Sequence, residues 1–176
     1  MEKTRDVLAS RLRSGDREAA AELIDIYYEQ IYRYMRRLGH DRQAGEDLTQ
    51  ETFLAAWQHI GQLRSDGALT GWIYHIAGNV SKGHWRNLDA ERFEITDDLV
   101  AGKDLGDAGH LEELARLHKA VENLPMKLKE PVILHYMQRL SIADAADAIG
   151  IRQGTLKSRL SRALRRLKKR LEPKGE

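Results

Sequence analysis

Apolar residues recur at intervals of three and four along almost the whole chain, and this spacing limits the possible fold more than any other feature of the sequence. It places apolar side chains on one face of an α-helix, whereas a half-buried strand alternates with a period of two. One such run ends at Gly39, a residue type that often terminates helices. Its apolar positions are Ala20, Leu23, Ile24, Tyr27, Ile31, Tyr34, Met35 and Leu38. The pattern continues through residues 43–60, 68–87, 111–124, 132–140, 142–149 and 153–171. We therefore predict an all-α protein.

The helical periodicity stops between Leu88 and His110, where glycines and aspartates are scattered through a polar stretch. That composition is typical of a linker. We expect two small helical domains, an N-terminal helical bundle over residues 1–90 and a C-terminal helix-turn-helix domain over residues 111–172. A flexible acidic linker over residues 91–110 joins them.

Charge is divided unevenly along the chain. The formal net charge is −2 over residues 1–95, −4 over residues 96–118 and +8 over residues 119–176, although the whole chain carries only +2. A basic C-terminal third indicates a polyanionic partner for that end of the protein.

The composition also excludes several classes of protein. The chain has no cysteine, which rules out disulfide scaffolds, thiolate metal sites and cysteine nucleophiles. No stretch approaches the roughly 18 apolar residues of a membrane span, and the N-terminus lacks an apolar signal segment, so we expect a soluble, cytoplasmic protein. A helical metalloenzyme is disfavoured because the seven histidines form neither HExxH nor paired ExxH motifs. We expect no cofactor and no metal.

The C-terminal segment has the layout of a helix-turn-helix. Ser141 can cap a short helix, Gly150 allows a tight turn, and a second helix follows. The inward residues would be Ile142, Ala145, Ala146 and Ile149 in the first helix, and Leu156, Leu160, Leu164, Leu167 and Leu171 in the second. The outward face would carry Gln153, Lys157, Ser158, Arg162, Arg165 and Arg166.

Residues 150–170 contain nine basic side chains and no acidic one. Basic groups on a helix that fits the major groove can neutralise phosphates and reach base edges. The alternative is a solvated basic face on an ordinary core helix. The coincidence of the basic run with the turn glycine and the leucine stripe favours DNA binding.

An acidic face is expected on the helix that contains residues 46–60. Its core side would be Leu48, Phe53, Ala56, Trp57 and Ile60. Asp47, Glu51, Leu54 and Gln58 fall on the opposite side, with Gln50 beside them. Such a face would repel DNA and suits docking of another protein, although an ordinary solvated face is the alternative.

A different face is expected within residues 71–87. The core stripe would be Ile73, Ile76, Ala77, Val80 and His84, with His75, Asn79, Lys82 and Arg86 opposite, flanked by Trp72 and Trp85. Cations and amides beside aromatic rings suit single-stranded nucleic acid, because bases stack on rings while phosphates meet the charges. Packing of Trp72 in the core is the alternative.

Together, the segments EDLTQETFLAAW, GWIYHIAGNVSKGHW and GTLKSRLSRA resemble the extracytoplasmic-function (ECF) group of bacterial sigma factors, in the sigma-70 family. The resemblance implies a non-enzymatic subunit that binds core RNA polymerase, directs it to specific promoters and helps to melt the DNA. Residues 1–90 would correspond to sigma region 2 and residues 111–172 to sigma region 4. A stand-alone helix-turn-helix regulator is the alternative; it would bind a duplex operator tightly without polymerase.

The helix faces and the resemblance together single out three sets of residues. For polymerase binding they are Asp47, Gln50, Glu51 and Leu54. For the melting element near minus ten, read partly as the non-template single strand, they are His75, Asn79, Lys82, Trp85 and Arg86. For the upstream element near minus thirty-five they are Gln153, Thr155, Lys157, Ser158, Arg159 and Arg162.

The sequence departs from the family pattern at a few positions. His75 stands where arginine is usual, Gly78 lies within a helix, and Arg152 and Gln153 replace the common pair before the recognition helix. Since the chain ends at Glu176 without a C-terminal extension, the resemblance implies a separate anti-sigma factor as regulator.

Overall fold

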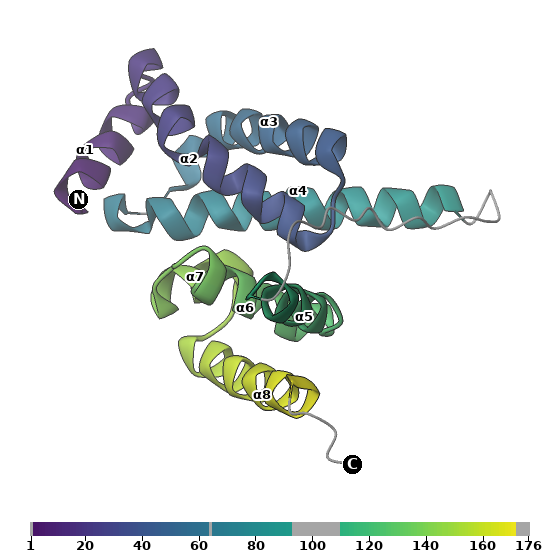
Figure 1. Cartoon of the computed structure of the whole chain (residues 1–176). Coiled ribbons are helices and arrows are strands. Elements are labelled where there is room, and N and C mark those ends of the chain that lie inside the picture. The colour runs from purple at the N-terminus through teal and green to yellow at the C-terminus, as the bar shows by residue number, and fades with distance from the viewer. Residues whose placement is uncertain (1, 64, 93–109, 172–176) are drawn as a thin grey trace, which may run out of the picture.

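The computed structural model describes residues 2–63, 65–92 and 110–171, and over these residues it contains helices and turns but no strand. The prediction of an all-α fold is confirmed. Figure 1 shows two groups of helices, one above the other. The N-terminal bundle comprises α1 (Glu2–Arg13), α2 (Arg17–Leu38), α3 (Arg42–His59) and α4 (Leu69–Arg92), with short 3-10 turns at Ile60–Gln62 and Asp66–Ala68. The C-terminal bundle comprises α5 (His110–Glu122), α6 (Met126–Val132), a π-helical turn at Ile133–Met137, α7 (Ile142–Ile149) and α8 (Gln153–Leu171).

Helix α2 forms the centre of the N-terminal bundle, and local signals define both of its ends. The Asp16 side chain accepts hydrogen bonds from the backbone N–H groups of Glu18 and Ala19, which caps the first turn. Gly39 adopts a left-handed conformation with φ of 106°, which ends the helix as predicted. The apolar stripe is buried except at Ala20, which is partly buried, and at Ile24, which is 41 % exposed. Ile24 therefore fits the apolar pattern but does not lie in the core.

Three helix boundaries differ from the prediction. Helix α1 was not predicted, although Leu8 and Leu12 are both buried against the rest of the bundle. Helix α4 continues to Arg92, four residues beyond the point at which the apolar pattern fails. The helix predicted over residues 132–140 is present with different bounds, because α6 begins at Met126, runs through Pro131 and widens into the π-helical turn, which ends at Met137. The predicted linker falls mainly on residues 93–109, outside the described residues.

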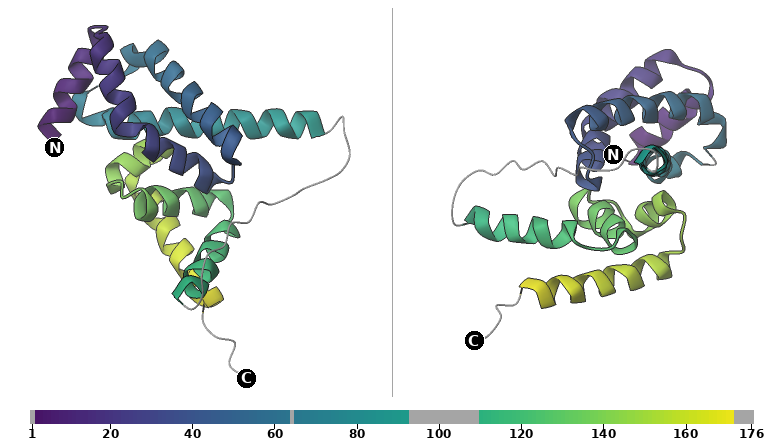
Figure 2. Two further views of the ribbon diagram at one scale, coloured as in Figure 1. Left: turned by 45° about the horizontal axis from the view of Figure 1, so that its top comes forward. Right: turned by 90° about the vertical axis from the view of Figure 1, so that its right-hand side faces the viewer.

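The two bundles contact each other through α4 and α7 (Figure 1). Helix α8 lies on the side of α7 that faces away from the N-terminal bundle, and both views in Figure 2 agree with this order. The Arg37 guanidinium donates to the backbone carbonyl of Met137 at 2.9 Å. The Tyr74 hydroxyl lies 3.2 Å from the side-chain amide of Gln138. Polar contacts as well as packing therefore join the bundles.

Candidate DNA and protein interfaces

The predicted helix-turn-helix is present in the C-terminal bundle. The Ser141 hydroxyl accepts a hydrogen bond from the Asp144 backbone N–H at 3.0 Å and caps α7. Gly150 has φ of 75°, the left-handed conformation that lets the chain turn directly from α7 into α8. Leu156, Leu160, Ala163 and Leu167 form the buried stripe of α8. Leu164 was assigned to the core and is 45 % exposed, because Ala163 occupies the inward position in that turn.

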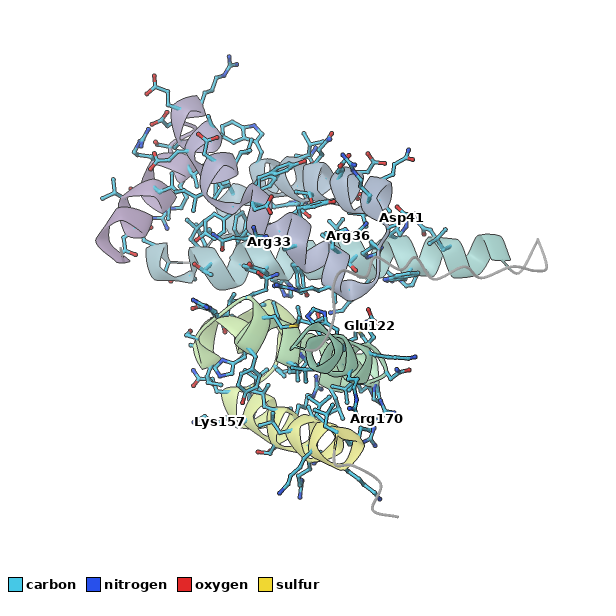
Figure 3. The ribbon with its side chains drawn as sticks, viewed as in Figure 1. Arg33, Arg36, Asp41, Glu122, Lys157 and Arg170 are labelled. Atoms are coloured by element: carbon cyan, nitrogen blue, oxygen red, sulfur yellow. The ribbon has the colours of Figure 1, made fainter. Side chains whose placement is uncertain are left out.

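The outward face of α8 presents its polar and basic groups to solvent. Gln153, Thr155, Lys157, Ser158 and Arg162 are exposed, and Arg159 is partly buried. Lys157 and Arg170 lie toward opposite ends of the helix (Figure 3). The Arg170 guanidinium donates to the backbone carbonyl of Ala120 in α5 at 3.4 Å, so the distal end also contacts its own bundle. The N-terminal half of α8 is therefore the part most accessible to the major groove of DNA.

Helix α3 carries the acidic face. Asp47, Gln50, Glu51 and Leu54 are all exposed, and Leu54 is 64 % exposed. This face of α3 therefore contributes little to the core. It combines the carboxylates of Asp47 and Glu51 with an exposed leucine, Leu54.

Two apolar residues beside this face were missed by the sequence reasoning. Trp57 was assigned to the core and is 41 % exposed, and Ile24 of α2 is equally exposed. Both line an apolar cleft of about 410 Å³ that also includes Leu54 and Phe53. Trp57 follows Leu54 by three residues, which places it about 60° away around the helix axis. This spacing is consistent with a position for Trp57 on the outer face. The core position was predicted because the tryptophan side chain is large and apolar.

The predicted DNA-facing stripe of α4 is divided between solvent and the C-terminal bundle. Asn79 and Arg86 are exposed. The Lys82 ammonium lies 3.2 Å from a carboxylate oxygen of Glu130 in α6. The Nδ1 of His75 lies 3.0 Å from the backbone carbonyl of Ala148 in α7, and because a carbonyl only accepts, Nδ1 carries the proton.

Trp72 and Trp85 flank the stripe, and both are partly buried. Trp72 packs against the hydrophobic core, in agreement with the alternative considered for it. The Trp85 ring stacks on His40, with ring centroids 4.7 Å apart and planes inclined by 22°. One face of Trp85 is therefore covered by protein, and its indole N–H finds no hydrogen-bond partner among the described residues.

His40 was not identified from the sequence. It is 4 % exposed, and its Nε2 lies 2.7 Å from the Ser81 hydroxyl. Burial, reinforced by the neighbouring His84, lowers the pKa of His40 to about 4. The side chain is therefore neutral at physiological pH, and it supports Trp85 from beneath. No short stretch of sequence predicts the contact between His40 and Ser81, because the two residues are 41 positions apart.

The described residues contain no group of three or more His, Asp or Glu side chains arranged to hold a metal ion. Within the same ranges, no helix is long and apolar enough to cross a membrane.

A helix-turn-helix whose second helix is basic and free of acidic residues is the geometry of proteins that dock a recognition helix in the major groove. Residues 23–91 match the family model Sigma-70 region 2, and residues 114–167 match Sigma-70, region 4. The chain is 30 % identical to RNA polymerase sigma-H factor of Pseudomonas aeruginosa, in an alignment that covers 94 % of this chain and 93 % of that protein. It is 29 % identical to ECF RNA polymerase sigma factor SigW of Bacillus subtilis, over 92 % of this chain and 93 % of that protein. The chain belongs to the sigma-70 family of RNA polymerase sigma factors, in its ECF group, whose members direct RNA polymerase to promoters.

Two solved structures have a similar fold. CnrH, in complex with the cytosolic domain of CnrY, is similar with a TM-score of 0.74 and 22 % identity, over 97 % of this chain and 99 % of that chain. The sigma factor RpoE, in complex with the anti-sigma factor NepR from Bartonella quintana, is similar with a TM-score of 0.73 and 25 % identity, over 88 % of this chain and 98 % of that chain.

Proposed function

We propose that this chain binds core RNA polymerase, directs it to specific promoters and helps to open the DNA for transcription initiation. Its partners are core polymerase, promoter DNA in duplex and non-template single-stranded form, and an anti-sigma factor. Its role is regulatory rather than enzymatic, and it acts in the cytoplasm, where polymerase and chromosome are found. The proposal rests on one observation. The basic recognition helix α8 and the acidic, partly apolar face of α3 lie on different bundles of one chain.

The basic face of α8 is assigned to the upstream element. Thr155, Lys157, Ser158 and Arg162 are exposed on the first half of the helix, the part that a helix-turn-helix presents to base edges. Arginine and lysine pair with guanine acceptors in the major groove, and hydroxyl groups can reach several bases. Gln153 and Arg159 complete the proposed surface. The distal basic residues then add attraction to phosphates without regard to sequence.

The acidic face of α3 is assigned to core polymerase. Asp47, Gln50 and Glu51 supply carboxylate and amide groups, while Leu54 supplies apolar area that is otherwise left in water. A DNA contact is disfavoured here because carboxylates repel phosphates. A mixed acidic and apolar surface on a folded helix suits a protein partner, whose aliphatic and basic groups can be complementary to it.

Helix α4 is assigned to promoter melting. Asn79 and Arg86 are accessible on its surface, and Lys82 and His75 lie on the same side of the helix. Trp85 is supported by His40 on one face, which would fix the ring in place beside an extruded base. Unpaired bases gain stability from aromatic contacts and from cations that neutralise the adjacent phosphates.

An anti-sigma partner is supported by the likeness to RpoE, which was solved in complex with the anti-sigma factor NepR. We propose that a separate protein of this type regulates the present chain. Its identity would follow from affinity capture with the full chain as bait.

Run-off transcription tests the proposed function. Core polymerase with the full chain is expected to produce promoter-specific transcripts from genomic fragments, whereas core polymerase alone is expected to produce none. A stand-alone regulator would instead bind duplex DNA tightly by itself and leave the transcripts of core polymerase unchanged. That second result would refute the proposal.

A further inference from the structure

The turn that leads into α7 contains an arginine in a backbone conformation that suits glycine. Arg139 has φ of 59°, which lies in the left-handed region. There the Cβ of an L-residue comes close to the following carbonyl oxygen, a contact that glycine avoids. Among the described residues, the other positions with positive φ are Gly15, Gly39 and Gly150. Arg139 is therefore the exception within its own chain.

Arg139 ends a helix in the same way as those glycines. The residue after it, Leu140, donates its backbone N–H to the carbonyl of Leu134 at 3.0 Å. The residue after Gly39 makes the same kind of bond, from its N–H to the carbonyl of Met35 at 3.3 Å. Such a helix end needs left-handed backbone just before the donor, and glycine is the usual residue there.

Contacts on both sides hold Arg139 in this conformation. Leu140 is buried, and its carbonyl accepts a hydrogen bond from Nδ1 of His135 at 2.8 Å. On the other side, the backbone N–H of Gln138 donates to the carbonyl of Ile133, also at 2.8 Å. The surrounding fold therefore imposes the strain on Arg139. Strain that is maintained in this way points to a role outside the stability of the fold.

The side chain of Arg139 is exposed to solvent. Within the part of the chain that the structure describes, its guanidinium makes no hydrogen bond and no ion pair. The guanidinium of Arg37, in contrast, donates to the carbonyl of Met137 at 2.9 Å. All five N–H donors of the Arg139 guanidinium are thus available to a partner outside the chain.

The charge of the neighbouring segment indicates the kind of partner. Helix α7 is the first helix of the helix-turn-helix and packs against α8, and in this motif the first helix crosses the DNA backbone. It contains Asp144 and Asp147 but no lysine or arginine. Arg139 is the only lysine or arginine between residues 131 and 151. Because carboxylates repel phosphates, a cation at the entrance to α7 offsets that repulsion.

We infer that Arg139 binds a backbone phosphate of duplex DNA when α8 lies in the major groove, and that this contact explains an arginine at a position suited to glycine. The inference rests on the proposed function for the placement of α8. A guanidinium fits this partner because two of its N–H groups can donate to two phosphate oxygens at once. Such a contact adds affinity without regard to base sequence and fixes the orientation of the motif on the duplex.

The first experiment measures binding of the full chain, without polymerase, to a short fluorescein-labelled duplex of mixed sequence by fluorescence anisotropy. Arg139→Gln removes the charge and keeps the Cβ atom. Loss of one phosphate contact is expected to reduce the slope of log affinity against log salt by about 0.9. Since counterion release contributes nothing near about 1 M salt, that slope predicts about fifteenfold weaker binding at about 50 mM salt and about fourfold at about 200 mM.

Two further variants serve as controls for charge. Arg17→Gln makes the same change of net charge at an exposed position of α2, in the other bundle, and is expected to bind like the wild type. Arg139→Lys keeps the cation at the turn, and lysine also binds phosphate, as a point charge. Its affinity and its salt dependence are expected to stay close to the wild-type values.

Arg139→Gly separates the DNA contact from the stability of the fold. It removes the guanidinium and the backbone strain together. We expect it to bind the duplex as weakly as Arg139→Gln but to melt about 2–4 °C above the wild type, as measured by far-UV circular dichroism. Arg139→Gln keeps a Cβ in the left-handed conformation and is expected to melt like the wild type. A damaged fold cannot explain weaker binding by a more stable variant.

Each outcome decides a part of the inference. Wild-type affinity and salt dependence in Arg139→Gln would overturn the phosphate contact, and so would an equal loss in Arg17→Gln or no binding of duplex by the wild-type chain at about 50 mM salt. Unchanged duplex binding with weaker binding to core polymerase would assign the guanidinium to a protein partner instead. A melting temperature that does not rise in Arg139→Gly would contradict the strain.

The anisotropy and melting experiments need no transcription. Failure of the proposed function would appear separately, as the absence of promoter-specific transcripts with the wild-type chain.

Discussion

Acid is expected to destabilise the N-terminal bundle through His40. The pKa of this side chain is about 4 in the folded protein, against an ordinary value of about 6.5 in an unfolded chain. The unfolded state therefore binds a proton more readily, and the stabilising contribution present above pH 6.5 is lost as the pH falls toward 4. Between pH 7 and pH 5 this linkage amounts to about 2 kcal/mol of unfolding free energy.

The surroundings of His40 account for the direction of the shift. Burial is the main cause; His84 and Lys129 act in the same direction, and Asp41 opposes them. A proton on the ring would place a charge in a site from which water is largely excluded. No carboxylate hydrogen-bonds to the ring among the described residues, so the charged form has little compensation.

Urea unfolding followed by tryptophan fluorescence provides the assay, because all three tryptophans, Trp57, Trp72 and Trp85, lie in the N-terminal bundle. The His40→Phe variant keeps an aromatic ring against Trp85 but removes the titrating group. The unfolding free energy of both proteins is compared at pH 7 and at pH 5. The decrease between these two pH values is expected to be about 2 kcal/mol smaller in His40→Phe than in the wild type. His59→Gln, at an exposed position, is expected to follow the wild type. An equally steep pH dependence in His40→Phe would refute the reasoning.

Three further predictions concern the interfaces. Reversal of Asp47 and Glu51 to lysine is expected to weaken binding to core polymerase without a change in melting temperature, and native-gel assembly of the holoenzyme that proceeds normally would contradict the assignment of α3. Asn79→Ala is expected to slow open-complex formation on duplex promoters more than on templates already mismatched at the melting element, as measured by permanganate footprinting, because mismatched DNA has a lower opening cost. Lys157→Ala is expected to cost about 1–3 kcal/mol on the cognate upstream element, while neutralisation of residues 168–170 is expected to weaken binding to all duplexes alike and to reduce its salt dependence. Competition titrations at several salt concentrations check Lys157→Ala and the variant neutralised at residues 168–170. Loss of sequence preference in the second variant alone would contradict the placement of the N-terminal half of α8 in the major groove.

The sequence predicted the elements whose signals are local. Ser141, Gly150 and the stripe that begins at Leu156 lie close together in the chain, so α7 and α8 were predicted with the boundaries that the structure has. Gly39 likewise determines the end of α2. Caps and turns depend on neighbouring backbone groups, which is why they can be recognised without knowledge of the tertiary structure.

The remaining features depend on residues that are distant in sequence. Periodicity shows which face of a helix is apolar but not whether another element covers it, so Trp57 and Leu164 were wrongly assigned to the core. Glu130 would be expected at the surface because it is charged. It is buried instead, and it accepts a hydrogen bond from the hydroxyl of Tyr34, which is 96 residues away in the sequence. The stacking of His40 on Trp85 is equally non-local. Such contacts arise from the packing of whole helices, which no short window of sequence contains.

The two docked bundles belong to one polypeptide, and this changes how strong their contact has to be. Sites joined by a short connection meet at an effective concentration of the order of millimolar. A dissociation constant of about 1 mM corresponds to only about 4 kcal/mol. The surface between α4 and α7 can therefore be too weak to join two separate molecules and still keep a single chain closed. A protease that cut between Arg92 and His110 would consequently release the C-terminal bundle by dilution, with every contact residue unchanged.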